Sequence, residues 1–166
     1  MSRPCLDDID RLLLQALQQN GRITNVELAR LVKLSPPTVL ERVRRLEESG
    51  VIQGYTALLD PQKLELGLMA FVVVNLSPHT RRAIERFQRE IMKLPQVVEC
   101  YYLAGEEDFL LKVYHRDIAS YRDFLISKLT TLPGVKKVRT LIVFNAIKQS
   151  HKLPLQPEKV NHDRRD

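Results

Sequence analysis

Apolar side chains along the first fifty residues recur at the three- and four-residue spacings of amphipathic helices. In residues 6–21 this stripe predicts a first helix, and its members are Ile9, Leu12, Leu13, Ala16 and Leu17. A shorter helix is expected over residues 25–32, because Thr24 and Glu27 have the spacing of a capping box.

The third predicted helix is marked at both of its ends. Ser35 is an N-cap residue ahead of Pro36, and Gly50 is a C-terminal stop. Between these ends, one stripe of the helix is apolar, at Val39, Val43 and Leu46. The opposite side carries Pro37, Thr38, Glu41 and Arg45, flanked by Arg42 and Arg44. Residues 51–60 alternate around a glycine, which predicts a short β-hairpin or wing.

A different pattern begins at about residue 68, where short apolar runs alternate with helical spacing. The expected strands are 69–76, 97–104, 109–114 and 137–147, and the expected helices are 78–94 and 118–132. This βαββαβ order predicts a ferredoxin-like domain, so the chain as a whole is expected to be α+β. The expected division is 1–60 for the helical domain, 61–67 for a linker, 68–150 for the second domain and 151–166 for a polar tail, disordered beyond Leu155.

Three helices with a short connection between the second and the third describe a helix-turn-helix, whose third helix enters the major groove of DNA. Short, polar or basic side chains at this helix and at the ends of its neighbours are expected to contact the DNA. They are Thr24, Asn25, Lys33, Ser35, Pro36, Pro37, Thr38, Glu41, Arg42, Arg44 and Arg45. The alternative is a trihelical bundle whose charged face is only solvated.

The net charge of +6 suits an acidic partner, but it does not come from the helical domain. Residues 1–60 hold eight basic and eight acidic side chains, whereas residues 61–150 hold fourteen basic and nine acidic ones. One predicted helix of the second domain carries Arg81, Arg82, Arg86, Arg89 and Lys93. This basic helix is either an ordinary solvated face or a surface over which DNA wraps in an oligomer.

Several other classes of function are disfavoured by the sequence. No apolar run is long enough to cross a membrane, and the first residues lack the apolar region of a signal peptide, so a cytoplasmic protein is expected. Cys5 and Cys100 cannot form a disulfide framework, and the four histidines lack metal-ligand spacing with them. No phosphate-binding loop or catalytic set is evident, so neither an enzyme nor a metal site is expected.

Longer stretches closely resemble the leucine-responsive regulatory protein family, also called Lrp/AsnC. They are TNVELARLVKLSPPTVLERVRRLEESGVIQGY, YTALLDPQKLELGLMAFVVV, ECYYLAGEEDFLLKV, the LPGV turn and NAIKQSHKLPL. The helix-turn-helix block matches in register at Ser35, Arg42, Arg45, Leu46, Glu47, Gly50 and Ile52. The resemblance implies a winged helix-turn-helix, a linker strand and a βαββαβ ligand-sensing domain. It also implies homodimers that assemble into octamers or similar rings, double-stranded DNA bent around them, and a response to amino acids or other small metabolites.

Two positions depart from the family pattern. Lys33 stands in the helix-turn-helix turn where the family often has Gly, and a lysine can adopt the required positive φ. The loop Gly105-Glu106-Glu107-Asp108 differs from the family's Gly-Asp-aromatic-Asp at Glu107. The expected effector-binding residues are Tyr102, Ala104, Gly105, Glu106, Glu107, Asp108, Leu141 and Ile142.

Asp108 is a plausible partner for the ammonium group of an amino acid, and no cofactor is expected besides such an effector. Without the resemblance, the loop reads as an ordinary strand connection with solvated acids. Three functions therefore remain: a DNA-binding regulator with an amino-acid sensor, a small-molecule-binding module or enzyme on the ferredoxin-like fold, and an architectural DNA-binding protein with a vestigial pocket.

Overall fold

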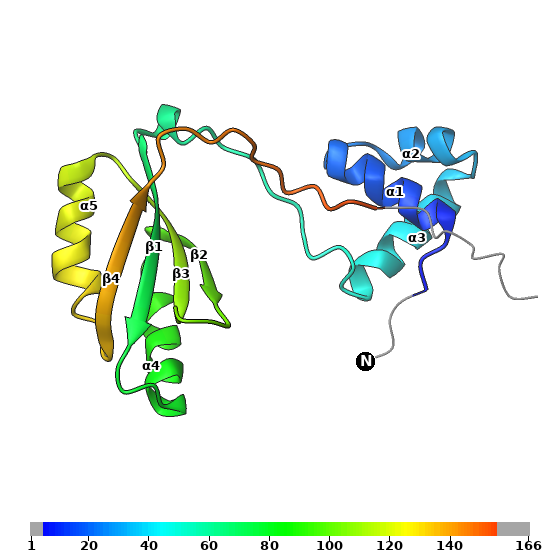
Figure 1. The fold of residues 1–166 in the computed structure, drawn as a ribbon. Helices are drawn as coiled ribbons and strands as arrows, with labels where there is room; N and C mark the ends of the chain where they lie inside the picture. Colours follow the sequence, from blue (N-terminus) through cyan, green and yellow to red (C-terminus); the bar gives the residue numbers. More distant parts are fainter. Residues whose placement is uncertain (1–4, 156–166) are drawn as a thin grey trace, which may run out of the picture. The chain divides into compact units, whose positions relative to one another are not determined.

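The computed structural model describes residues 5–155, which form two compact units. The first contains residues 5–58 together with 149–155, and the second contains residues 59–148. The chain thus passes from the first unit to the second and back again (Figure 1). The predicted linker, 61–67, belongs to the second unit, and the beginning of the predicted tail belongs to the first.

Three helices build the first unit: α1 (Asp8–Gln19), α2 (Asn25–Val32) and α3 (Pro36–Glu48). All three were expected, and the capping box of α2 is present, because the Thr24 and Glu27 side chains each accept the other's backbone N–H. The core between the helices is aliphatic, and its fully or nearly fully buried members are Leu13, Leu28, Ala29, Val39 and Val43.

The turn from α2 to α3 passes through Lys33, which adopts the left-handed conformation with φ 56° and ψ 42°. A non-glycine residue there costs on the order of 1 kcal/mol, so the turn tolerates a lysine without breaking. This confirms the expectation that Lys33 takes the place of a glycine.

Residues 51–60 do not form the predicted β-hairpin, because they contain bends and extended chain without paired strands. The first part of the segment packs on the helices instead, whereas Leu58 and Leu59 are mostly exposed. Ile52 contacts the helical core, and its amide donates to the Leu46 carbonyl oxygen at 3.0 Å. The Tyr55 hydroxyl donates to Glu47 Oε1 at 2.9 Å. Ile52 and Tyr55 therefore attach the start of this segment to the helices without strand pairing.

The second unit is a four-stranded antiparallel sheet with helices, in the strand order β2-β3-β1-β4. This confirms the predicted βαββαβ order. Its elements are η1 (Gln62–Leu64), β1 (Leu68–Leu76), α4 (Arg81–Ile91), β2 (Val97–Tyr102), β3 (Phe109–His115), α5 (Ile118–Phe124), the π-helical turn η2 (Leu125–Leu129) and β4 (Val135–Ile142).

Both helices pack on the same face of this sheet. Alternate residues of β1, from Leu68 to Leu76, lie in one core with Phe87 of α4 and Phe124 of α5. The intervening residues point to the other face, which no helix of the described unit covers. There, cross-strand register aligns Tyr101, Leu110, Val73 and Arg139 in one row, and Glu99, Lys112, Phe71 and Leu141 in the next.

Several predicted elements end earlier than expected: the helix over 78–94 ends at Ile91 and the strand over 97–104 ends at Tyr102. The last strand was predicted over 137–147, but β4 covers Val135–Ile142, and beyond it the Val143 amide still donates to the Met69 carbonyl oxygen at 3.0 Å. The helix predicted over 118–132 is α-helical only to Phe124 and continues as the π-helical turn.

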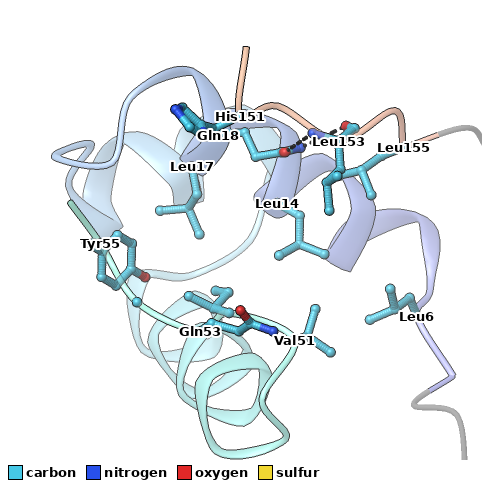
Figure 2. Close-up of a pocket in the computed structure, with 12 residues that line it drawn as sticks. Leu6, Leu14, Leu17, Gln18, Val51, Gln53, Tyr55, His151, Leu153 and Leu155 are labelled. Carbon is cyan, nitrogen blue, oxygen red and sulfur yellow. Dashed lines mark hydrogen bonds between the residues drawn. The ribbon is translucent and has the colours of Figure 1, made fainter. Parts of the chain in front are cut away.

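The segment 149–155, here called the C-terminal strap, lies against α1. Gln18 both donates to the Leu153 carbonyl oxygen, at 3.2 Å, and accepts from the Leu153 amide, at 2.6 Å. Gln15 donates to the Leu155 carbonyl oxygen at 3.0 Å. Figure 2 shows the strap, α1 and residues 51–55 around a cavity of about 390 Å³, and five of the twelve residues that line it are leucines. The disorder predicted beyond Leu155 lies outside the described residues.

Candidate nucleic-acid interface and effector loop

The α3 helix packs against the other two helices with one side and exposes its other side to solvent. Val39, Val43 and Leu46 are buried, whereas Pro36, Pro37, Thr38 and Glu41 are exposed, as expected for a helix that enters a groove. Ser35 caps the helix, since its hydroxyl accepts from the Thr38 amide at 3.3 Å, and the two hydroxyls are 2.7 Å apart.

Arg42 and Arg45 turn toward α1 rather than outward. Arg42 Nη1 donates to Asp7 Oδ2 at 2.7 Å and to Asp10 Oδ1 at 2.9 Å, and Arg45 Nη2 donates to both oxygens of Asp10, at 3.1 and 2.9 Å. Asp10 is only 1% exposed, so its carboxylate is a buried charge compensated by two guanidinium groups. The Arg42 side chain is 23% exposed and that of Arg45 is 59% exposed.

These contacts give the two arginines different roles. The pKa of Arg42 is raised by its hydrogen bonds to Asp7 and Asp10, and the pKa of Asp7 is lowered, first by the Asp10 amide and then by Arg42. With little exposure and two carboxylate partners, Arg42 fastens α3 to α1. Arg45 remains accessible to a ligand on the open side.

The remaining predicted DNA-binding residues differ in their exposure and in their hydrogen-bond partners. Arg44 pairs with Glu48 one turn on, at 2.7 Å, and both side chains are exposed, so the pair is weak and easily exchanged for a phosphate. Lys33 is exposed at the turn. Thr24 uses its hydroxyl in the cap of α2, where it donates to Glu27 at 2.8 Å, and Asn25 is half-buried.

One exposed residue on α3 was missed by the sequence reasoning. Leu40 is 54% exposed although it is a large aliphatic residue on a helix of the first unit's core. An apolar side chain at such a place can contact the methyl group of thymine. The available signal was its position outside the apolar stripe of Val39, Val43 and Leu46.

The loop between β2 and β3 is tied to the end of β1. Asp108 accepts the Leu76 amide at 2.7 Å and lies 2.7 Å from His79 Nε2 through its other oxygen. Glu107 accepts from Arg139 at 2.9 Å. Only the exposed carboxylate of Glu106 has no partner among the described residues. The predicted ammonium partner, Asp108, is thus already engaged, and Glu106 is the available acid.

The predicted effector residues do not form one site within the chain. The loop lies next to residues 75–76 of β1, because Asn75 donates to the Glu106 carbonyl oxygen at 2.8 Å, whereas Leu141 and Ile142 pair with residues 71 and 70. Five residues of strand separate these places by about 16 Å. The register also puts Tyr102 on the helix-covered face and Leu141 on the open face.

No group of three or more His, Cys, Asp or Glu side chains in residues 5–155 is arranged to hold a metal ion. Within the same residues, no helix has the length and apolar character needed to cross a membrane. Burial raises the pKa of the half-buried Cys100 thiol, which lowers its reactivity.

Comparison with known proteins covers both units. Residues 6–53 match the family described as winged helix-turn-helix DNA-binding, and residues 69–153 match the one described as Lrp/AsnC ligand binding domain. The leucine-responsive regulatory proteins of Escherichia coli K12 and Salmonella typhimurium LT2 are each 46% identical over 151 residues, which is 91% of this chain and 92% of the relative.

Solved structures agree with this assignment. A transcriptional regulator from Neisseria meningitidis in complex with L-Met has a TM-score of 0.87 and 39% identity, covering 91% of this chain and 97% of that chain. AsnC of E. coli has a TM-score of 0.83 and 28% identity, covering 90% and 99%. The chain therefore belongs to the Lrp/AsnC family and is a transcription regulator with a helix-turn-helix DNA-binding domain and a ligand-binding domain.

Proposed function

We propose that the outward side of α3 reads a specific DNA site and that an amino acid bound by oligomers of the second unit modulates this binding. The observation that supports DNA binding is the way in which α3 packs on the other helices. Its apolar stripe is buried against the other helices, while Pro37, Thr38 and Glu41 are exposed and Arg45, although it bonds to Asp10, is 59% exposed. A rigidly held helix with one accessible polar side suits the major groove.

Within this proposal, Thr38, Glu41 and Arg45 contact base edges, and Leu40 contacts a thymine methyl group. Lys33 and the Ser35 hydroxyl contact phosphate. The backbone at the start of α3 contributes no free donor, because Pro36 and Pro37 have no amide hydrogen and the Thr38 amide already donates to Ser35. Arg42 contributes by holding α3 in place. The protein then acts as a binding regulator in the cytoplasm, where the DNA is, and catalyses no reaction.

The DNA half is tested by selection from a random-sequence duplex library with the full chain, followed by binding measurements at fixed salt. Recovery of a consensus motif, bound at least about a thousandfold more tightly than unrelated duplex, supports the proposal. The Thr38→Ala/Glu41→Ala variant should lose preference at particular base pairs. Recovery of random sequence, or an unchanged base preference in that variant, argues against readout by α3.

The effector half is supported by the acidic loop and by the relative that binds L-Met. The free carboxylate of Glu106 suits an ammonium group, and Leu141, which is 44% exposed on the open face, offers an apolar surface for a side chain. Because these features are about 16 Å apart in one chain, the proposed pocket is completed by a second copy. An aliphatic or thioether amino acid is the ligand class that this combination favours.

The open face of the sheet supports self-association. Phe71, Tyr101, Leu110 and Leu141 lie there without a covering helix, in a sheet whose other face is fully packed. A homodimer through this face, assembled further into a ring, would bury them. Light scattering of the full chain should give a mass of at least twice 19.2 kDa. A monomer at micromolar concentration would contradict the proposal.

The effector is sought by a thermal-shift screen of the amino acids. A ligand at one hundred times its dissociation constant should stabilise the folded state by about 2.7 kcal/mol. Glu106→Gln should abolish the shift, whereas Glu107→Gln, at the acid paired with Arg139, should reduce it less. A screen in which no amino acid raises the melting temperature would favour an architectural DNA-binding protein instead.

A further inference from the structure

The α4 helix of the ligand-binding unit carries a straight row of cations on its exposed side. Arg82, Arg86, Arg89 and Lys93 follow one another at intervals of four, three and four residues. At 3.6 residues per turn the three arginines fall within a stripe about 60° wide, opposite the buried Ile91, and Lys93 follows in the turn after the helix ends. We call these four residues the α4 cationic stripe.

The stripe has few acids to balance its charges. The pKa of Glu90 is lowered first by its hydrogen bond from Lys93 and further by the charges of Lys93, Arg86 and Arg89, so three cations share this one carboxylate. Lys93 pairs with Glu90, and Arg81, beside the stripe, pairs with Glu85. Arg82, Arg86 and Arg89 are exposed and form no ion pair with any described residue.

The row is also unfavourable for the helix itself. The first turns of α1 and α2 carry acidic residues, as the helix dipole favours, but α4 has none there and begins with two arginines. Like charges three and four residues apart, as in Arg82, Arg86 and Arg89, repel one another. A row of like charges that destabilises its own helix is expected at a functional site, where a bound ligand supplies the negative charge that the helix lacks.

The charge distribution between the units points to the same ligand. The helix-turn-helix region is neutral overall, and Arg42, Arg44 and Arg45 already have carboxylate partners. Residues 61–150 instead carry fourteen basic against nine acidic side chains. Since protein–DNA affinity depends largely on phosphate neutralisation, cations of the second unit can add to what Lys33 and Arg44 supply.

From these observations we propose that the α4 cationic stripe is a second DNA-binding surface, which holds the phosphate backbone without reading bases. From Arg82 to Arg89 the stripe is about 10 Å long, a length over which one strand of B-DNA presents about three phosphates. DNA is favoured over a membrane because the apolar side chains of α4, such as Phe87 and Ile91, are buried in the core and cannot insert into lipid. The inference rests on the proposed function, in which the protein binds DNA through α3.

The test compares the full-length protein with two variants that each lose three positive charges. One is Arg82→Gln/Arg86→Gln/Arg89→Gln, in the stripe, and the matched control is Arg116→Gln/Arg122→Gln/Lys128→Gln, elsewhere in the same unit. Binding is measured against salt concentration on the duplex selected by the wild type, about two helical turns long, and on the same site within about fifteen turns. Circular dichroism spectra and melting temperatures establish that both variants are folded.

On the long duplex, the stripe variant should have a log K against log salt slope about 2 to 3 units shallower than the wild type, and the control variant should not. Unchanged base preference on the short duplex shows that α3 still reads its site. Equal slopes for the stripe variant and the control would overturn the inference while leaving the proposed function intact. So would stripe-dependent binding to vesicles that contain anionic lipid, with unchanged DNA slopes. Failure of the wild type to select any duplex would overturn both.

Discussion

Replacing Asp10 by Asn removes a buried negative charge while nearly preserving the shape of the side chain. Asp10 is 1% exposed and accepts four hydrogen bonds, one from Arg42, two from Arg45 and a long one from the Asp7 amide. Asn offers one acceptor oxygen in place of two and no charge, so both guanidinium groups lose part of their compensation.

The magnitude follows from the exposure of the two partners. Arg42 is largely buried, and losing its charged hydrogen bond costs about 1.5–2 kcal/mol. Arg45 is more than half exposed and can turn to water, so its bonds contribute at most about 1 kcal/mol. Asp10→Asn should therefore destabilise the helical unit by about 2–3 kcal/mol, a 30- to 150-fold increase in its opening equilibrium.

Hydrogen exchange followed by mass spectrometry measures this effect locally. Peptides from α1 and α3 report on the helical unit, and β1 in the second unit is an internal reference. Asp7→Asn is the matched control, because Asn is an equally good N-cap and Asp7 is half exposed, so the cost should stay below about 1 kcal/mol. If Asp10→Asn changes exchange no more than Asp7→Asn does, the buried ion cluster does not hold α3 in place.

Three further outcomes are expected. Arg45→Ala should weaken binding to the selected duplex by about 1–3 kcal/mol at fixed salt, as measured by fluorescence anisotropy, and an unchanged affinity would remove Arg45 from base readout. Burial lowers the pKa of His115 below its ordinary value of 6.5, so the unfolded state binds the proton more readily and the second unit should lose stability as the pH falls from 7 to 5. Denaturation of His115→Phe should lack this component, and the same pH dependence in both proteins would refute it. Gln18→Ala should speed exchange of the Leu153 amide several-fold with little change in the α1 core, and equal exchange would mean that Gln18 does not fasten the strap.

The helices and the strand order were predictable because they depend on local signals. Capping residues such as Thr24, Ser35 and Gly50 act within a few positions of themselves, and the apolar spacing of β1 reports directly on burial. The π-helical turn was not predictable, because its apolar residues keep a spacing that also suits an α-helix.

The site residues were predicted less well for a different reason. A helical wheel shows which way Arg42 points but not that Asp10, which lies 32 positions earlier in the sequence, receives it. Likewise, the resemblance brought Leu141 and the acidic loop into one list, whereas strand register places them at opposite ends of the sheet. Long-range pairing of this kind follows from the tertiary fold and leaves no periodic signal in the sequence.

The C-terminal strap makes the DNA-binding unit discontinuous in sequence, because its last segment follows the entire ligand-binding unit. During synthesis, α1, α2 and α3 are complete long before residues 149–155 leave the ribosome. The helical unit must therefore first exist with the leucine-lined side of α1 uncovered. Any fragment that ends near residue 60 lacks the strap permanently. The stability and DNA affinity measured on such a fragment therefore describe the helical unit before the strap has bound, not the finished regulator.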